Sequence, residues 1–298
     1  MLTHLDFLLS TQKEELNRLI KRIADLIIPE KIICYGVRTS FYRNWSCVQQ
    51  HTEEHYPTFD LLVITDKDEE REDHVTVQMV EQFSTSTITI TCIAHRLPTV
   101  NSQIEAAHPF FCSLYEKGLR LYEKNDRPLS APPPSYRNIP TKELAEAYWS
   151  RWYGLAKNFW QVALESLAKG SHEITVFLLH QCVEHTCIAL IRVFTGYHTN
   201  THNLSRLLTF IENFSVLLLT AFPGITKEEK ELFSILLRGY SDPRYQEMYE
   251  VAPDKVAILV ERVKELQESA ESLYEGRIAM YSQVLETVLP MFNPSQNV

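Results

Sequence analysis

The sequence predicts an α/β domain followed by an all-α helical bundle. Short apolar runs alternate with helical periodicities up to residue 125, and proline-rich sequence follows. After residue 140 only helical spacing remains. Alternating strands and helices are typical of an α/β sandwich, whereas helices alone pack as a bundle. We therefore predict domains at residues 1–125 and 141–298, joined by a linker at residues 126–140.

Strand and helix patterns follow each other through the first domain. Residues 10–28 have apolar side chains at helical spacing, and Thr11 with Glu14 fits a capping box. The apolar and β-branched runs 31–36, 59–64 and 87–93 predict strands, the first ending in a tight turn at Gly36. Helices are expected at 69–83 and 100–117, and a last strand at 119–122.

Prolines separate this region from the helical half. Pro128 and the three prolines at 132–134 make the linker semi-rigid, because consecutive prolines favour an extended backbone. Beyond the linker, punctuation by glycine and proline divides the sequence into five helices. They are predicted at 141–169, 172–195, 203–221, 226–240 and 253–285.

Composition limits the classes of function. The net charge of −9 repels phosphate backbones, so we expect no broad DNA binding. The six cysteines contain no Cys-x-x-Cys pair, which indicates reduced thiols and not a zinc site. Neither a signal peptide nor a run of about 18 apolar residues is visible, and we expect a cytoplasmic protein without a membrane span.

Gly36 ends the first predicted strand, and Asp60 lies inside the second. This pattern resembles the active site of minimal nucleotidyltransferases of the polymerase-β superfamily. Their Gly-Ser turn binds phosphate, and two or three strand carboxylates hold a divalent metal. Here Val37 replaces the serine, Thr58 replaces the first aspartate, and strand 87–93 has no acid. The resemblance implies a small mixed sheet in which Gly36 and Asp60 are vestigial catalytic candidates, since one carboxylate holds magnesium poorly.

Three motifs follow in order in the helical half. Gln181 and Glu184 share a predicted helix face, residues 201–208 read Thr-His-Asn-Leu-Ser-Arg-Leu-Leu, and residues 240–245 read Tyr-Ser-Asp-Pro-Arg-Tyr. They resemble the Gln-x-x-Glu, Thr-His-(Asp/Asn)-Leu-x-x-Leu and Tyr-x-x-x-Arg-Tyr motifs of HEPN domains. The resemblance covers residues 141–280 and implies an all-α HEPN bundle. Its fusion to a nucleotidyltransferase-like domain is itself an arrangement of this family.

These motifs predict a ligand site around Arg244. Arginine binds phosphate with two parallel hydrogen bonds, and tyrosine rings stack on bases, so a nucleotide is the expected ligand. The predicted ligand-binding residues are Glu184, His202, Tyr240, Arg244 and Tyr245. Pro243 interrupts the helix between Tyr240 and Arg244 and leaves their facing open. In the competing interpretation, Arg244 forms an internal ion pair with Asp242 or Glu184.

The leading functional hypothesis is a non-catalytic nucleotide-binding or interaction protein. The alternatives are a residual nucleotidyltransferase, a divergent ribonuclease and a structural dimer without ligand. HEPN ribonucleases use an arginine followed by four to six residues and a histidine, but no histidine follows Arg244. Arg192 and His198 have that spacing at the end of the second helix. We predict no metal site and no cofactor, because no further ligands join His180 and Glu184.

The resemblance also implies a homodimer formed through the helical domain. The first helix of that domain is apolar on more than one face, which supports this prediction, because such a helix needs a cover beyond its own bundle. Its aromatic residues are Tyr148, Trp149, Trp152, Tyr153, Phe159 and Trp160.

Overall fold

The chain divides into two units, Met1–Asn138 and Ile139–Val298. The computed structural model describes residues 5, 8–44, 47–48, 52–124, 127–134, 136, 140–245 and 249–288. Part of the predicted linker, at residues 126, 135 and 137–139, lies outside the described residues.

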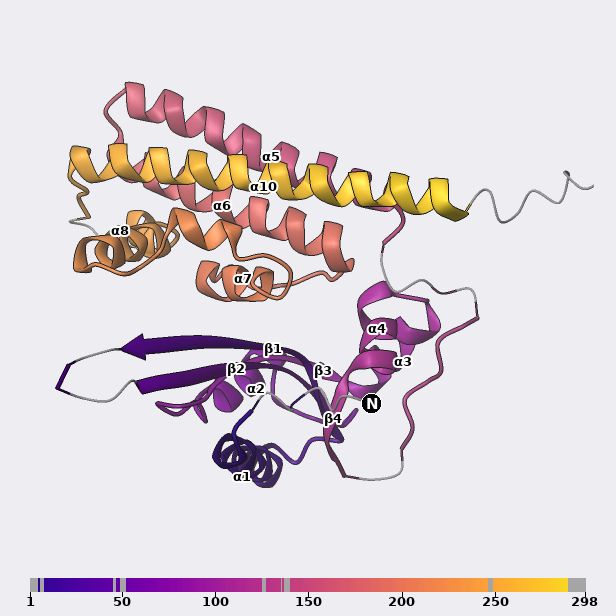
Figure 1. Cartoon of the computed structure of the whole chain (residues 1–298). Helices are drawn as coiled ribbons and strands as arrows, with labels where there is room; N and C mark the ends of the chain where they lie inside the picture. Colours follow the sequence, from indigo (N-terminus) through magenta and orange to yellow (C-terminus); the bar gives the residue numbers. More distant parts are fainter. Residues whose placement is uncertain are drawn as a thin grey trace, which may run out of the picture. The chain divides into compact units, whose positions relative to one another are not determined.

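The first unit contains a four-stranded mixed sheet (Figure 1). Its strands are β1 (Lys31–Asn44), β2 (Thr52–Thr65), β3 (Thr89–Arg96) and β4 (Leu119–Glu123), in the order β3-β2-β1-β4. Strand β1 is antiparallel to β2 and β4, whereas β2 and β3 are parallel. The small mixed sheet predicted from the sequence is therefore confirmed.

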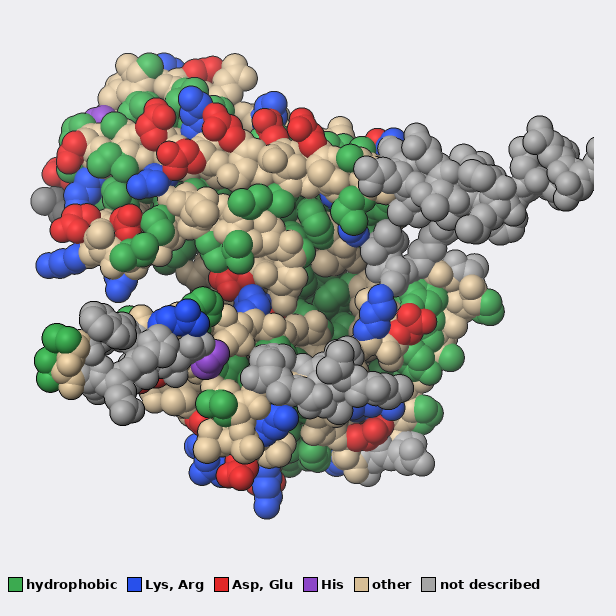
Figure 2. Space-filling view, in the orientation of Figure 1, with side chains coloured by type: hydrophobic (Ala, Val, Ile, Leu, Met, Phe, Trp, Pro, Cys, Tyr) green, Lys and Arg blue, Asp and Glu red, His purple; other side chains and the backbone are tan. Residues whose placement is uncertain are grey.

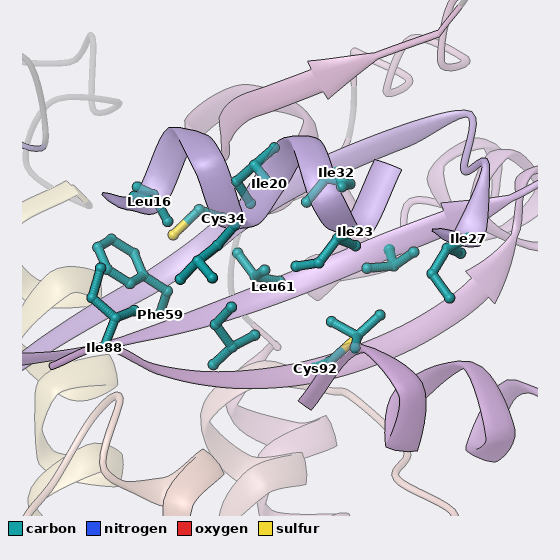
Figure 3. Close-up of a cluster of buried hydrophobic side chains, with 14 of the residues drawn as sticks. Leu16, Ile20, Ile23, Ile27, Ile32, Cys34, Phe59, Leu61, Ile88 and Cys92 are labelled. Atoms are coloured by element: carbon teal, nitrogen blue, oxygen red, sulfur yellow. The ribbon is translucent and has the colours of Figure 1, made fainter. Parts of the chain in front are cut away.

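Helices pack against the sheet through apolar faces. Helix α1 (Ser10–Ile27) directs an apolar face, with Leu16, Ile20 and Ile23, toward β-strand side chains such as Phe59 and Leu61 (Figure 3). Helix α2 (Asp73–Glu81) adds Val77 and Val80 to the same buried cluster. Helices α3 (Leu97–Glu105) and α4 (Pro109–Lys117) contact β2 and β1. The strand that bears Asp60 is thus part of a packed core.

Three local predictions in this unit were wrong. The strand expected to end at Gly36 runs on to Asn44 and forms a long hairpin with β2. The single helix expected at 100–117 is two helices, because Ala107 has a φ of 59° and Pro109 starts a new helix. Helix α1 begins at Ser10, so Gln12 bonds back to the amide of Leu9 in place of the expected Thr11–Glu14 box.

The second unit is a helical bundle built around α6 (His172–Thr195). Helices α5 (Lys142–Ala168) and α10 (Pro253–Val288) lie beside it (Figure 1). Helix α6 has the length and apolar character of a membrane span, but 72% of its apolar window is buried inside the structure. It therefore serves as the core helix of the bundle.

Shorter helices complete this unit. They are α7 (Leu204–Ile211), the 3-10 helix η1 (Leu217–Ala221), α8 (Lys227–Arg238) and α9 (Asp242–Tyr245). The helix predicted at 203–221 is thus broken into α7 and η1. Polar side chains explain the break, because Asn213 Nδ2 donates to Phe210 O and Ser215 Oγ accepts from Leu217 N.

Gly118 gives a test of how α4 meets the sheet. A Cβ placed there would lie 2.4 Å from Leu114 O and 2.5 Å from Ile33 Cγ2. We expect Gly118→Ala to lower the free energy of unfolding by about 1–3 kcal/mol, because backbone atoms cannot move aside cheaply. Urea unfolding measures this loss. The control is Gly154→Ala in α5, where no atom lies within 4 Å and alanine should stabilise the helix by up to about 1 kcal/mol. Equal effects of the two changes would contradict this packing.

Candidate functional site

Gly36 lies inside a strand and not in a phosphate-binding turn. The β1–β2 register shifts between Cys34 and Gly36, which places Gly36 opposite Asp60 at a β-bulge. The residues after it, including Val37 and Thr39, continue to pair with β2. No helix opens at this glycine, so its backbone amides do not form the phosphate cradle that the sequence suggested. The tight turn predicted at Gly36 is therefore wrong, because the strand continues through this residue.

Asp60 is buried and already neutralised by the protein. Its side chain is 1% exposed, and Oδ2 lies 2.5 Å from Arg38 Nη1. Thr91 on the neighbouring strand donates its hydroxyl to Oδ1. Arg38 and Asp60 come from diagonal positions of adjacent strands, a distance that a long side chain spans. The carboxylate that would hold a metal cation therefore faces a guanidinium cation.

The thiol next to this pair is also unreactive. Burial raises the pKa of Cys34 to about 12, and the negative charge of Asp60 contributes to the rise. The protonated thiol points at Gly36 O at 3.2 Å. A thiolate is the nucleophilic and metal-binding form of cysteine, so Cys34 offers neither function here.

The buried carboxylate at the predicted ligand site of the helical unit is Glu184 on α6, which is 2% exposed. Its Oε1 accepts a hydrogen bond from His202 Nδ1 at 2.8 Å, and its Oε2 accepts one from Gln181 Nε2 at 3.1 Å. The expected common face of Gln181 and Glu184 is thus observed. Asn203 caps α7 by accepting from Arg206 N, and this cap fixes the segment that carries His202.

His180 lies one turn before Glu184 and completes this cluster. Its Nδ1 is 2.9 Å from Leu236 O, and its Nε2 is 3.7 Å from Glu184 Oε2. Burial lowers the pKa of His180, which favours the neutral ring. His180 was not among the predicted ligand-binding residues, although its four-residue spacing from Glu184 was the available signal.

Tyr240 joins the carboxylate cluster to Arg244. The His202 ring is nearly parallel to the Tyr240 ring, with centroids 5.7 Å apart. The guanidinium carbon of Arg244 lies 3.9 Å from the same centroid, and Arg244 Nε donates to Tyr240 O at 2.7 Å. The facing left open by Pro243 is therefore settled: Arg244 covers the ring across the break between α8 and α9.

The structure shows neither of the internal ion pairs considered for Arg244. Among the described residues, no carboxylate lies within salt-bridge distance of this exposed guanidinium. Asp242 is instead 3.9 Å from Arg238 and accepts from Ser241 Oγ at 3.0 Å. Tyr245 is 77% exposed, and its ring centroid is 5.2 Å from the guanidinium carbon of Arg244. The five predicted ligand-site residues thus form one connected cluster.

Arg192 and His198 approach the same aromatic side chain at the end of α6. The guanidinium carbon of Arg192 lies 5.1 Å from the ring centroids of both Tyr148 and Trp152. The His198 ring is 6.4 Å from Trp152. Burial lowers the pKa of His198, and the charge of Arg192 lowers it further.

No group of three or more histidine, cysteine or acidic side chains suited to a metal occurs in the described part of the chain.

Comparison with protein families identifies the helical unit. Residues 149–274, from within α5 to within α10, match the family model of the HEPN domain. The helical unit contains a HEPN domain. Glu184, His202, Tyr240 and Arg244 all lie inside the matched range. The all-α HEPN bundle predicted from the sequence motifs is confirmed.

The solved structures similar to the chain include a nucleotidyltransferase-like protein from Exiguobacterium sibiricum 255-15. The match covers 89% of this chain and 78% of that one, at 12% identity and a TM-score of 0.28. The curated proteins contain no match to the chain.

The Arg38–Asp60 pair can be tested through stability. Arg38→Met would leave the buried carboxylate without its counter-ion, and we expect the free energy of unfolding to fall by about 3–5 kcal/mol. Urea unfolding of the full chain measures the loss. In the double variant that also carries Asp60→Leu, most of the loss should return, because no charge is then buried. Arg43→Met, at an exposed position of the same strand, is the control. Full stability of Arg38→Met would contradict the pairing.

Proposed function

We propose that this chain is a non-catalytic nucleotide-binding or interaction protein of the nucleotidyltransferase–HEPN type, and that it binds its ligand through the HEPN domain. The main support is the state of Arg244. Its guanidinium is exposed, its guanidinium carbon lies 3.9 Å from the Tyr240 ring centroid, and its Nε donates to Tyr240 O. Its two terminal nitrogens form no ion pair with any residue in the part of the chain that the structure describes.

In this proposal the phosphate binds Arg244 and the base stacks on a nearby ring. Two guanidinium nitrogens suit two phosphate oxygens, because the fork geometry gives parallel hydrogen bonds. Tyr245 offers an exposed ring 5.2 Å from the guanidinium carbon. Acidic and basic side chains are mixed over the face of the helical unit seen in Figure 2, which supports a local anion site and not a broad nucleic-acid surface. We expect the protein to act in the cytoplasm.

We further propose that the first unit is a pseudoenzyme. Gly36 lacks the turn that would hold phosphate, Thr58 replaces one carboxylate, and Arg38 neutralises the remaining one at Asp60. Incubation with radiolabelled nucleoside triphosphates and magnesium should give no covalent nucleotidyl product on the chain or on added acceptors. Labelling that disappears in Asp60→Asn would show instead that the sheet retains catalysis.

A divergent ribonuclease is the second candidate. It is favoured by one observation: the Arg192 guanidinium carbon and the His198 ring lie 5.1 Å and 6.4 Å from the ring of the same residue, Trp152. Single-stranded RNA that is cut by the purified protein, and left whole by His198→Ala, would favour this candidate over the binding protein.

Nucleotide binding should depend on Arg244. We expect Arg244→Ala to weaken the binding of nucleoside monophosphates at least tenfold by calorimetry, because a bidentate phosphate contact is lost. The melting temperature should hardly change, since the side chain is exposed. Arg262→Ala is the matched control, because Arg262 lies on α10 and donates a hydrogen bond to Glu265 there. Unchanged affinity in Arg244→Ala would exclude this site.

We also propose a homodimer that pairs through α5. Leu144, Leu155 and Val162 are 38%, 37% and 47% exposed, and their spacing puts them on one helix face. The aromatic residues of α5 are buried or half-buried, and Trp149 stacks on Tyr274 of α10. The exposed aliphatic stripe is therefore the part that still needs a cover.

Sedimentation of the full chain should give twice the chain mass of 34.7 kDa at micromolar concentration. Leu155→Glu should shift the sample to monomer, because it places a charge in the apolar contact. Leu26→Glu, at a 48% exposed position of α1, should leave the dimer intact. A wild-type protein that sediments as a monomer would rule out the dimer.

A further inference from the structure

His202 presents one ring nitrogen to solvent because the other is committed to Glu184. Nδ1 lies 2.8 Å from Glu184 Oε1. An ionised carboxylate only accepts hydrogen bonds, so Nδ1 carries the proton. In the neutral ring Nε2 then bears a lone pair, and the side chain is 62% exposed. A lone pair repels a phosphate oxygen, so neutral His202 cannot bind an anion through this nitrogen.

The negative charge of Glu184 remains available to His202. The other histidine of the cluster does not cancel it, because His180 Nδ1 must donate to the carbonyl oxygen of Leu236, 2.9 Å away. His180 Nε2 is buried and stands 3.7 Å from Glu184 Oε2. Burial lowers the pKa of His180, which favours the neutral ring. Glu184 is thus a buried carboxylate that accepts from Gln181 and from the exposed imidazole of His202.

The groups around His202 favour an anionic ligand. Glu184 and His180 face it from α6, Tyr240 stacks beside it after α8, and Arg244 reaches that tyrosine ring from α9. Arg206 lies in the first turn of α7, directly after the segment of His202. Arg244 and His202 both lie against Tyr240, at 3.9 Å and 5.7 Å from its ring centroid.

We infer that the ligand carries a phosphate monoester, and that His202 takes up one proton from solvent at Nε2 when this phosphate binds. The doubly protonated ring then donates Nδ1–H to Glu184 and Nε2–H to a phosphate oxygen. His202 becomes a cation between two anions, and Arg244 binds the other phosphate oxygens. This inference rests on the proposed nucleotide-binding function and adds the ligand group and its coupling to pH.

The sign of the pH dependence follows from this uptake. If one proton enters with the ligand, the dissociation constant rises by up to about tenfold for each unit of rising pH. Binding should therefore strengthen as the pH falls from 8 toward 7, while a site that uses only arginine would show no such change.

Calorimetry of the full chain at pH 8 tests the uptake. The probes are the adenosine, guanosine, cytidine and uridine 5′-monophosphates, which are dianions at this pH. Tris and HEPES have different ionisation enthalpies. The difference between the binding heats in the two buffers is therefore proportional to the number of protons taken up, and we expect about one proton for each bound nucleotide. The nucleosides without phosphate should bind at least tenfold more weakly.

Variants locate the proton. His202→Gln should bind the same nucleotide more weakly, with equal heats in the two buffers. His74→Gln, an exposed histidine of the first unit, is the control and should keep the uptake. Uptake that persists in His202→Gln and disappears in His180→Asn would overturn the assignment to His202.

The remaining outcomes separate this inference from the function on which it rests. Nucleotide binding without any buffer dependence of the heat overturns the inference and leaves the proposed function standing. Nucleosides that bind as tightly as their monophosphates overturn the phosphate assignment. No binding of any of the four nucleotides overturns the proposed function together with the inference.

Discussion

A carboxylate that is taken out of water needs a partner, and this constraint shapes the candidate sites in both units. Asp60 and Glu184 are 1% and 2% exposed. The first is held by Arg38, a permanent cation that is itself largely buried. The second is held by His202, which keeps one ring nitrogen at the surface. The Arg38–Asp60 pair therefore offers no exposed group to a ligand, whereas the Glu184–His202 pair keeps the His202 ring exposed.

The same contrast explains why the two units differ in chemistry. In the sheet, the bulge at Gly36 and the Arg38–Asp60 pair keep a packed core but remove the phosphate turn and the free carboxylates. In the bundle, the break between α8 and α9 brings Arg244 over Tyr240 next to the Glu184–His202 pair. An ion pair that satisfies both partners has no charge left for a ligand, whereas a guanidinium on an aromatic face does.

Local sequence patterns predicted most of the helices and strands, but they could not predict contacts between residues far apart in the sequence. Helix α6 was found with its observed bounds because its apolar periodicity and its glycine cap are local signals. The turn at Gly36 was wrong because the strand is extended by pairing with residues 52–59, which depends on register. Arg38 was missed for the same reason, since a diagonal pair on two strands leaves no spacing signal. Tyr240 and Arg244 were predicted from a motif, but their stacking across Pro243 needed the structure.

We propose that a nucleotide binds the cluster of Glu184, His202, Tyr240 and Arg244 and not the sheet. Hydrogen-exchange mass spectrometry of the full chain, with and without adenosine 5′-monophosphate and magnesium, tests this most directly, because it reports both units in one sample. We expect slower exchange in peptides that cover residues 199–206 and 238–245, and unchanged exchange in peptides that cover 33–40 and 58–62. Protection confined to the segments of Gly36 and Asp60 would contradict it.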